Sequence, residues 1–463
     1  MKTRSFELPF IGYDYAKEHG WKMDVLIGQY GNPIIGIRIK NIVEQYSADP
    51  DRYERFHTVL NQVIAIVGEE HIVQKVDIFA KKKYTAEKEK TFLQQKYSEH
   101  FDGRIFKTID TLLLFTDLLD NNKSKYKFSE KKYKELRDKC EKVFLLLEQS
   151  ECEPNWLFEK DFEYYIGGTL TMKFADIPSF DNIKSTNEYL RIGNSFVKTI
   201  SFVDVENIDL PSSITPYTNM GGNGIVSDLA IDNFSFLNEL EEYQTIIYNQ
   251  VIAIPNQVHN IAVDGQLVVD AHFSLVVACD TLEKMEKTQS TIESKLFTKG
   301  IIVSKNAYNQ MELFRSAIIG NAVELKDYDL FTTTSEAGIC FFFKESFPIS
   351  EKSNFYLRFA DRQGVPLKVD TSDLPYQTGR INNRNKFVLG PSGSGKSFLM
   401  NNIVEQYLTY NYDVVIVDTG DSYSGTCSYK GGKYIKYTEE KPITMNPFVM
   451  NEKEFNIEKI EFL

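Results

Sequence analysis

The chain has few of the residues that mark disulfide-bonded, zinc-binding or fibrous proteins. Its five cysteines are an odd number and form no C-x-x-C pair, which argues against a disulfide framework and against a zinc site. Its six histidines include no H-x-x-x-H pair, so a metal-dependent hydrolase is disfavoured. Fourteen prolines and 26 glycines among 463 residues are too few for a fibrous or low-complexity protein. These absences leave an ordinary globular protein of a reducing, cytoplasmic compartment.

Long apolar runs are also lacking. The longest run, residues 111–119, has half of the ~20 residues that a membrane-spanning helix needs. The basic N-terminus has no apolar stretch of the kind found in a secretory signal. We therefore expect no transmembrane segment in this chain, which leaves docking onto a membrane complex open.

Acidic residues outnumber basic ones by 65 to 53, and the formal net charge is −12. This balance argues against a general nucleic-acid coat, but direct nucleic-acid binding stays open because a local basic groove could still form. Lysines gather at residues 81–83 and 123–139, where they could contact nucleic acid or acidic lipid. Glu130, Glu135 and Asp138 lie among them, and this mixture favours a solvated helix face.

Length and composition predict several domains, since domains usually run ~100–200 residues and 42% of the chain is hydrophobic. Residues 1–155 are expected to form a first domain of strands followed by two helices. The expected strands lie near 24–28, 33–39 and 71–79, and the expected helices run from Thr85 and over 133–147.

Residues 156–370 are expected to form a second α+β domain. Helical patterns alternate there with short strand-like runs, and this order is typical of a split β-α-β sandwich. The expected helices include 234–248, 281–297 and 307–319, and the expected strands include 266–269, 272–279, 300–303, 338–343, 355–359 and 365–369. A polar linker over 371–385 then leads to a third region, 386–463.

Residues 390–397 read G-P-S-G-S-G-K-S, which matches the phosphate-binding pattern G-x-x-x-x-G-K-[ST] at every defined position. Lys386–Leu389 suits a strand, and apolar residues recur at helical spacing after Ser397. The motif therefore lies between the strand and the helix that it requires. A chance match arises in about one or two of 100 such chains. We predict that residues 386–463 begin an α/β P-loop NTPase domain.

Each position of this loop has a physical role in holding a nucleotide. Glycines let main-chain amides converge on the phosphates. The Lys396 ammonium can reach the β- and γ-phosphates and is the expected contributor to catalysis, and the Ser397 hydroxyl can ligate Mg²⁺. The predicted cofactors are ATP and Mg²⁺, and the predicted contact residues are Gly390, Ser392, Gly393, Ser394, Gly395, Lys396, Ser397 and Phe398.

Asp418 follows the apolar run Asp413–Val417 and has two possible roles. In compact P-loop kinases and GTPases, a carboxylate this soon after the loop can hold Mg²⁺, and a phosphotransferase could also use it as a base. In motor-type ATPases another strand intervenes and the magnesium carboxylate comes later. Periodicity alone does not decide between these roles. A phosphotransferase is disfavoured because no arginine follows Asp418.

The block from Lys386 to Phe448 resembles the TraG-type conjugation ATPases of Bacteroidetes conjugative elements, which belong to the VirB-type ATPases of type IV secretion. The resemblance rests on the loop G-P-S-G-S-G-K-S-F, on V-V-I-V-D-T-G-D-S-Y and on I-T-M-N-P-F. Residues 72–84 also resemble the N-terminal domain of that family. The resemblance covers most of the chain, and the loop is its most specific part.

This resemblance implies an α+β region that docks on inner-membrane channel proteins at the cytoplasmic face, followed by a RecA-like motor that forms hexamers. It assigns phosphate and Mg²⁺ contacts to Gly390, Gly395, Lys396 and Ser397. It makes Asp418 the end of the strand after the P-loop helix, so that the magnesium carboxylate would come later. A doubly wound ATPase domain needs roughly 200 residues. Because the chain ends at Leu463, we expect an incomplete motor domain in a truncated or split member of the family.

Three functions follow from these observations. The first is ATP hydrolysis that powers channel assembly or substrate transfer in a conjugative type IV secretion apparatus. The second is a scaffold that binds channel partners without hydrolysis, and the third is a related DNA-translocating motor. Whether the chain is an active enzyme stays open, since the later magnesium carboxylate and an arginine finger are not expected before Leu463.

Overall fold

The computed structural model divides the chain into two compact units. The first contains residues 1–88, 96–350 and 360–367, and the second contains residues 89–95, 351–359 and 368–463. The residues that the structure describes are 6–43, 50–89, 92–119, 127–174, 182–204, 236–256, 267–298, 301–304, 308–342, 346–348, 350–361 and 364–440.

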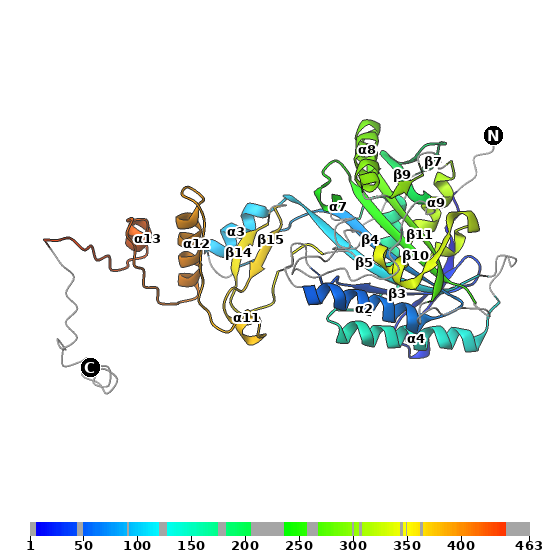
Figure 1. The fold of residues 1–463 in the computed structure, drawn as a ribbon, viewed down its shortest axis with the longest axis horizontal. Helices are drawn as coiled ribbons and strands as arrows, with labels where there is room; N and C mark the ends of the chain where they lie inside the picture. Colours follow the sequence, from blue (N-terminus) through cyan, green and yellow to red (C-terminus); the bar gives the residue numbers. More distant parts are fainter. Residues whose placement is uncertain are drawn as a thin grey trace, which may run out of the picture. The chain divides into compact units, whose positions relative to one another are not determined.

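A 13-stranded antiparallel sheet forms the framework of the first unit (Figure 1). Its strands are β1 (Phe10–Asp14), β2 (Val25–Gly28), β3 (Pro33–Ile39), β4 (His71–Lys83), β5 (Ile105–Asp117), β6 (Asn155–Trp156), β7 (Ile183–Ser185), β8 (Leu190–Ile192), β9 (Ser195–Asp204), β10 (Thr245–Ile254), β11 (Val268–Cys279), β12 (Ile302–Val303) and β13 (Phe331–Thr334). The main path runs β1-β2-β3-β5-β4-β10-β11-β9-β8-β7. β6, β12 and β13 pair with β3, β9 and β11 beside this path.

The centre of the sheet consists of its long strands β5, β4, β10 and β11. β10 is buried at every position, and β4 is buried from His71 to Ala80. Such continuous burial requires cover on both faces of the sheet. In the β4–β10 pair, Asp77 lies opposite Tyr248. Strands from residues 1–155 and from residues 156–370 therefore share one sheet.

Helices cover both faces of this sheet. The α-helices before residue 340 are α1 (Ala16–His19), α2 (Pro50–Val67), α3 (Phe92–Phe101), α4 (Glu130–Gln149), α5 (Glu159–Thr171), α7 (Phe236–Glu239), α8 (Leu282–Thr298), α9 (Gln310–Ala317) and α10 (Ser335–Ile339). Buried residues of α2, α4 and α8 join one hydrophobic cluster with Val73 of β4. Those of α5 and α9 join a second cluster with Val76 of the same strand. Residues three apart on a strand point to opposite faces, so the helices form a layer on each side.

The amphipathic pattern of α4 explains its place in one of these layers. Tyr133, Leu136, Cys140, Val143 and Leu147 recur at helical spacing and are all buried. Lysine and glutamate side chains fill the opposite face. The helix expected over 133–147 is therefore confirmed, and it extends a few residues beyond those bounds.

Charged side chains lie buried inside the sheet. Lys75 and Asp77 of β4 have no exposed surface, and Lys75 Nζ lies 2.5 Å from Asp77 Oδ2. The carboxylate also accepts hydrogen bonds from Thr111 Oγ1 at 2.6 Å and from Gln250 Nε2 at 2.7 Å. These bonds join β4 to β5 on one side and to β10 on the other. Three donors thus compensate a carboxylate that is removed from water.

Some expected elements of this unit are wrong. Residues 245–254 form β10 where a helix over 234–248 was expected, because pairing with both β4 and β11 outweighs the local helical pattern. The described residues of the expected strand 338–343 lie in α10 and in a 3₁₀ turn. A short apolar run fits a buried helix as well as a strand. The helix expected from Thr85 begins only at Phe92.

The second unit contains the P-loop motif and a small core. It contains most of β14 (Leu357–Ala360) and the end of β15 (Pro366–Val369), which pair in a two-stranded sheet, and the helices α11 (Asp373–Gln377), α12 (Lys396–Thr409) and α13 (Ser424–Tyr429). Phe355, Leu357 and Ile403 are buried together where β14 packs against α12 (Figure 1). The helix expected after Ser397 is confirmed as α12.

Three runs that were expected as strands of this unit do not join a sheet. Residues 386–389, 413–417 and 433–437 pair with no strand of the described chain. Their apolar side chains are open to solvent, with Phe387 exposed to 89% and Val417 to 96%. A doubly wound sheet buries such residues on both faces. The described fold is therefore α+β with a large antiparallel sheet, and the turn expected at 445–448 lies outside the described residues.

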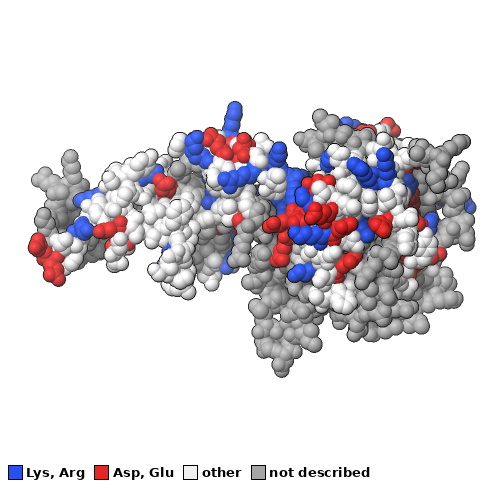
Figure 2. Space-filling view, turned by 90° about the horizontal axis from the view of Figure 1, so that it is seen from above, with Lys and Arg blue, Asp and Glu red and all other residues white. Residues whose placement is uncertain are grey.

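Charges of both signs share the surface. Figure 2 shows Lys and Arg side chains interspersed with Asp and Glu on the face that it displays. Within the expected basic patch, Lys82 pairs with Asp110 at 3.4 Å and Lys132 pairs with Glu70 at 2.6 Å. Residues 120–126 lie outside the described part of the chain. Within the described ranges, no helix combines the length and the apolar character needed to cross a bilayer.

Candidate functional site

The P-loop motif forms a turn directly before α12. Gly393 and Gly395 have φ angles of +80° and +87°, in the left-handed region that residues with a Cβ rarely adopt. A Cβ at either position would meet nothing within 4 Å, so glycine is needed here for its backbone conformation. Gly395 caps the helix, and Lys396 is its first residue. The glycine spacing of the motif therefore turns the chain into the helix.

The start of α12 presents main-chain amides that a ligand can use. Among the residues that the structure describes, the amides of Gly395, Lys396 and Ser397 have no main-chain acceptor. This follows from helix geometry, since the first N–H groups have no preceding turn to bond. The first turn contains no acidic side chain, and the helix dipole adds partial positive charge. These features together favour an anionic ligand.

The side chain of Lys396 folds back over the loop. Its Nζ donates to the carbonyl oxygen of Gly390 at 2.7 Å and to that of Pro391 at 2.8 Å. The amide of Ser394 donates to Pro391 O at 3.2 Å and closes the turn. Charge-assisted bonds to phosphate oxygens are stronger than bonds to neutral carbonyls. A bound phosphate would therefore draw the ammonium away from these carbonyl groups.

The other predicted contact residues surround the same turn. A Cβ at Gly390 would lie 2.5 Å from Ser394 Oγ, so this close approach suits glycine. Ser392 and Ser397 are exposed, and Phe398 is 81% exposed at the start of α12. The structure thus places every predicted phosphate-contact residue on one accessible turn.

The residues of this turn fit the triphosphate of a nucleotide and its magnesium ion. Free amides, a lysine ammonium and a serine hydroxyl are the groups that bind phosphates and Mg²⁺ in such loops. The runs 386–389 and 413–417, which would support the loop in a sheet, are exposed instead. The phosphate-binding groups are therefore present, but within the described residues no sheet holds them in position.

Asp418 lies in a separate turn after α12. Its Oδ1 accepts the amide of Gly420 at 3.0 Å, and its Oδ2 accepts the amide of Ser422 at 2.6 Å. Within the described part of the chain, no hydrogen bond or ion pair joins Asp418 to Lys396 or Ser397. These contacts give Asp418 a structural role in its own turn and do not bring it to the loop.

Asn401 links this turn to the P-loop helix, although the sequence pattern did not single it out. Its Nδ2 donates to Ser397 O at 2.9 Å and to Ser422 O at 3.3 Å. Its Oδ1 accepts a hydrogen bond from Thr426 Oγ1 at 2.6 Å. The available signal was an amide side chain one helical turn after Ser397, within a mostly apolar stretch. Asn401 therefore holds the turn that contains Asp418 against α12.

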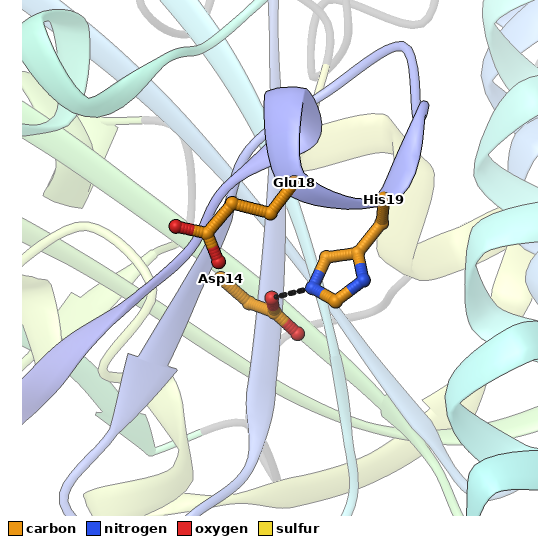
Figure 3. A group of neighbouring side chains, drawn as sticks. All are labelled: Asp14, Glu18 and His19. Carbon is orange, nitrogen blue, oxygen red and sulfur yellow. Dashed lines mark hydrogen bonds and ion pairs between the residues drawn. The ribbon is translucent and has the colours of Figure 1, made fainter.

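A separate group of metal-ligating side chains lies in the first unit. Ligand atoms of Asp14, Glu18 and His19, from the end of β1 and from α1, lie within 4.8 Å of one another (Figure 3). His19 Nε2 is 2.6 Å from Asp14 Oδ1, and Tyr133 Oη donates to Asp14 Oδ2 at 2.8 Å. Glu18 and His19 are exposed. Because protein groups already satisfy Asp14, the arrangement is explained as hydrogen bonding between neighbouring side chains at the surface.

Comparison with known proteins supports the family inferred from the motif. The family model described as the TraG P-loop domain matches residues 356–463. The match includes β14, the turn at 390–397 and α12. This match confirms the resemblance to TraG-type conjugation ATPases over residues 356–463, and the resemblance of residues 72–84 stays a prediction. A search of curated proteins gives no significant match.

Proposed function

From the TraG P-loop domain that this chain carries at residues 356–463, we propose that the protein is an ATP-binding component of a conjugative type IV secretion apparatus. The role implied by the family is ATP hydrolysis that powers channel assembly or substrate transfer. The observation that supports it most is the turn at 390–397, where free amides and the Lys396 ammonium gather before α12. Such a turn binds the phosphates of a nucleotide.

Different residues of the turn would bind different parts of the nucleotide and its magnesium ion. The amides of Gly395, Lys396 and Ser397 would bind phosphate oxygens at the positive end of the helix dipole. The Lys396 ammonium would exchange its two carbonyl contacts for the β- and γ-phosphates and neutralise charge that develops during transfer. The Ser397 hydroxyl would ligate Mg²⁺. When bound, this ion supplies further charge neutralisation.

Hydrolysis by the isolated chain is expected to be slow. Phosphoryl transfer depends on positioning and on charge stabilisation, and each missing group lowers the rate by orders of magnitude. The runs 386–389 and 413–417 are exposed, and the Asp418 carboxylate is bound by amides of its own turn. A RecA-like arrangement would require these runs to be buried in a sheet. We propose that they become buried when the protein forms a homo-oligomer, which the family resemblance implies is a hexamer.

A scaffold role is the second candidate. The first unit has two extensive hydrophobic clusters on the two faces of its sheet, whereas the hydrophobic cluster of the second unit has three buried members among the residues described. The stable part of the protein is therefore the first unit. In this role it would dock on inner-membrane channel proteins at the cytoplasmic face, without hydrolysis. A DNA-translocating motor that shares the loop is a third candidate.

A DNA-transfer assay in cells that lack the native gene separates the first two candidates. Lys396→Ala removes the ammonium of the loop, and Lys433→Ala removes an exposed lysine of the same unit as a matched control. If ATP use is required, Lys396→Ala should reduce transfer by orders of magnitude, while Lys433→Ala should transfer normally. Normal transfer with Lys396→Ala at normal protein level would contradict the hydrolase and support the scaffold.

Two further results bear on these proposals. Deletion of the whole gene without loss of transfer would contradict both candidates. Steady-state hydrolysis by the purified wild type at ordinary ATPase rates, absent from Lys396→Ala, would contradict the expectation of slow turnover. It would also show that the described turn needs no further support.

A further inference from the structure

We propose that a pocket at the C-terminal end of α12 binds the planar ring of a nucleobase, at a site separate from the P-loop. The pocket has a volume of about 650 Å³ and lies entirely within the second unit. Its walls come from the loop before β14, from α11 and from the turn that follows α12. The inference does not depend on nucleotide binding at the P-loop.

Aromatic side chains form one wall of the pocket. Tyr412 is 49% exposed, and its ring packs edge-on against Phe355 at 5.6 Å and against Tyr407 at 6.0 Å. Asn411, with φ of +58°, turns the chain after α12 and brings Tyr412 back beside the helix. The ring is therefore fixed by its neighbours while part of its surface stays free. A fixed aromatic ring with a free face is what base stacking requires.

Two exposed amide side chains belong to the polar lining of the pocket, together with Lys352, Ser353 and Asp373. Asn354 and Gln377 line it, and within the described residues neither side chain has a hydrogen-bond partner. A carboxamide offers both donors and an acceptor, which match the donor and acceptor edge of a base. The ring of a phenylalanine, tyrosine or tryptophan carries at most one polar group, whereas the edge of a base carries donors and acceptors side by side. The amides therefore favour a nucleobase over a protein partner.

The two sides of the pocket are held together by one carboxylate. Asp370 Oδ1 accepts the amides of Ser372 and Asp373, each at 2.8 Å. Its Oδ2 accepts Ser353 Oγ at 2.6 Å and the amide of Leu374 at 2.9 Å. These bonds join the start of α11 to the loop that precedes β14. The pocket is therefore a built feature of the fold.

The two arginines near the pocket are paired with carboxylates, and Lys352 belongs to the pocket lining itself. Arg384 Nε lies 2.7 Å from Asp373 Oδ1, and Arg380 lies 2.9 Å from Glu351. A site that acts mainly through phosphate attraction would present unpaired cations and bind more weakly as salt rises. With a single lysine in the lining, stacking and base-edge contacts should contribute more than phosphate attraction. A free nucleotide and a single strand offer the same base, so both are possible sources.

The length of α12 separates this pocket from the phosphate-binding turn. The helix has 14 residues, which corresponds to about 20 Å along its axis. Lys396 lies at its first residue, and Tyr410 follows its last. A nucleoside triphosphate with its phosphates on the turn cannot extend its base that far. The pocket would therefore hold a different ligand molecule from the one at the P-loop.

The test uses 2-aminopurine, whose fluorescence is quenched when it stacks. The full chain with Lys396→Ala, which lacks the P-loop ammonium, is titrated into 2-aminopurine riboside or into a short oligodeoxyadenylate that contains one 2-aminopurine. We expect saturable quenching of at least one probe. Tyr412→Ala should weaken binding by about tenfold or more, whereas Tyr412→Phe should keep it because the ring is retained. Tyr429→Ala, at a tyrosine 81% exposed elsewhere in the same unit, is the matched control.

Each outcome decides something. Quenching of the riboside identifies a free nucleoside or nucleotide, and quenching of the oligonucleotide alone identifies a single strand. No saturable quenching of either probe at millimolar protein, or equal affinity with Tyr412→Ala and Tyr412→Phe, would overturn the proposal. Displacement of the probe by N-acetyltyrosinamide more readily than by adenosine would also overturn it, in favour of a peptide partner.

Discussion

Replacing Lys75 by Met tests whether the buried ion pair of β4 holds the first unit together. Neither Lys75 nor Asp77 has exposed surface, and their charged atoms are 2.5 Å apart. After the substitution Asp77 keeps the hydroxyl of Thr111 and the amide of Gln250 but loses its only cationic partner in the described network. Removing one partner of a buried pair costs about 3–5 kcal/mol, because the other charge stays in the interior.

The dependence on pH adds a second signature. Burial lowers the pKa of Lys75, and the Asp77 carboxylate opposes this effect only in part. Between that lowered pKa and about 10.5, the unfolded wild type binds more protons than the folded protein. The free energy of unfolding of the wild type should therefore rise with pH between these two pKa values. Lys75→Met should lack this rise, so its deficit should grow there.

Urea unfolding followed by tryptophan fluorescence measures this effect. Both tryptophans, Trp21 and Trp156, belong to the first unit, so the signal reports this unit alone. Lys132→Met is the control. It breaks the ion pair between Lys132 and Glu70, whose side chains are 52% and 43% exposed respectively, and it should therefore lose far less stability. Equal losses for Lys75→Met and Lys132→Met would refute the reasoning.

Three other predictions concern smaller features. Burial lowers the pKa of His272 to about 4. As pH falls from about 6.5 to about 4, this histidine is protonated in the unfolded chain but not in the folded one, so the free energy of unfolding should fall by up to about 3 kcal/mol. His272→Asn should flatten this curve in urea titrations, and an unchanged curve would contradict the assignment. Asn401→Ala should speed hydrogen exchange at residues 418–426 without changing the tryptophan-detected midpoint, because the two bonds that tether this segment to α12 are lost; unchanged exchange would argue against the tether. Gly395→Ala strains a backbone at φ +87° and should weaken binding of a fluorescent ATP analogue about tenfold, whereas Gly425→Ala, where a Cβ meets open space, should not.

Local features of the second unit could be predicted because they depend on contiguous residues. The glycine spacing at 390–395 fixes a turn, and the apolar spacing after Ser397 fixes α12. The contacts of Asn401 were not predictable in the same way, because two of its partners lie more than 20 residues later in the chain. The exposure of residues 413–417 was also not predicted. An apolar run indicates that a segment tends to be buried, but it does not show whether a partner strand is present.

Distant pairing decided most of what the sequence pattern missed in the first unit. β10 forms because it pairs with β4 on one side and with β11 on the other, although part of its sequence has a helical pattern. Lys75 and Asp77 alternate with apolar residues on β4, a pattern that would ordinarily face water, yet other layers cover both side chains. α2 was not expected in the strand-rich first 80 residues, and it covers one face of the sheet.

Isothermal titration calorimetry of the full chain with magnesium and ATP, or with a non-hydrolysable analogue, tests nucleotide binding by the turn at 390–397 most directly. The wild type and Lys433→Ala should give a saturable heat that depends on magnesium. Lys396→Ala should lose this heat, because the loop then lacks its ammonium. No magnesium-dependent heat from a wild-type sample that is folded by circular dichroism would contradict nucleotide binding at the P-loop.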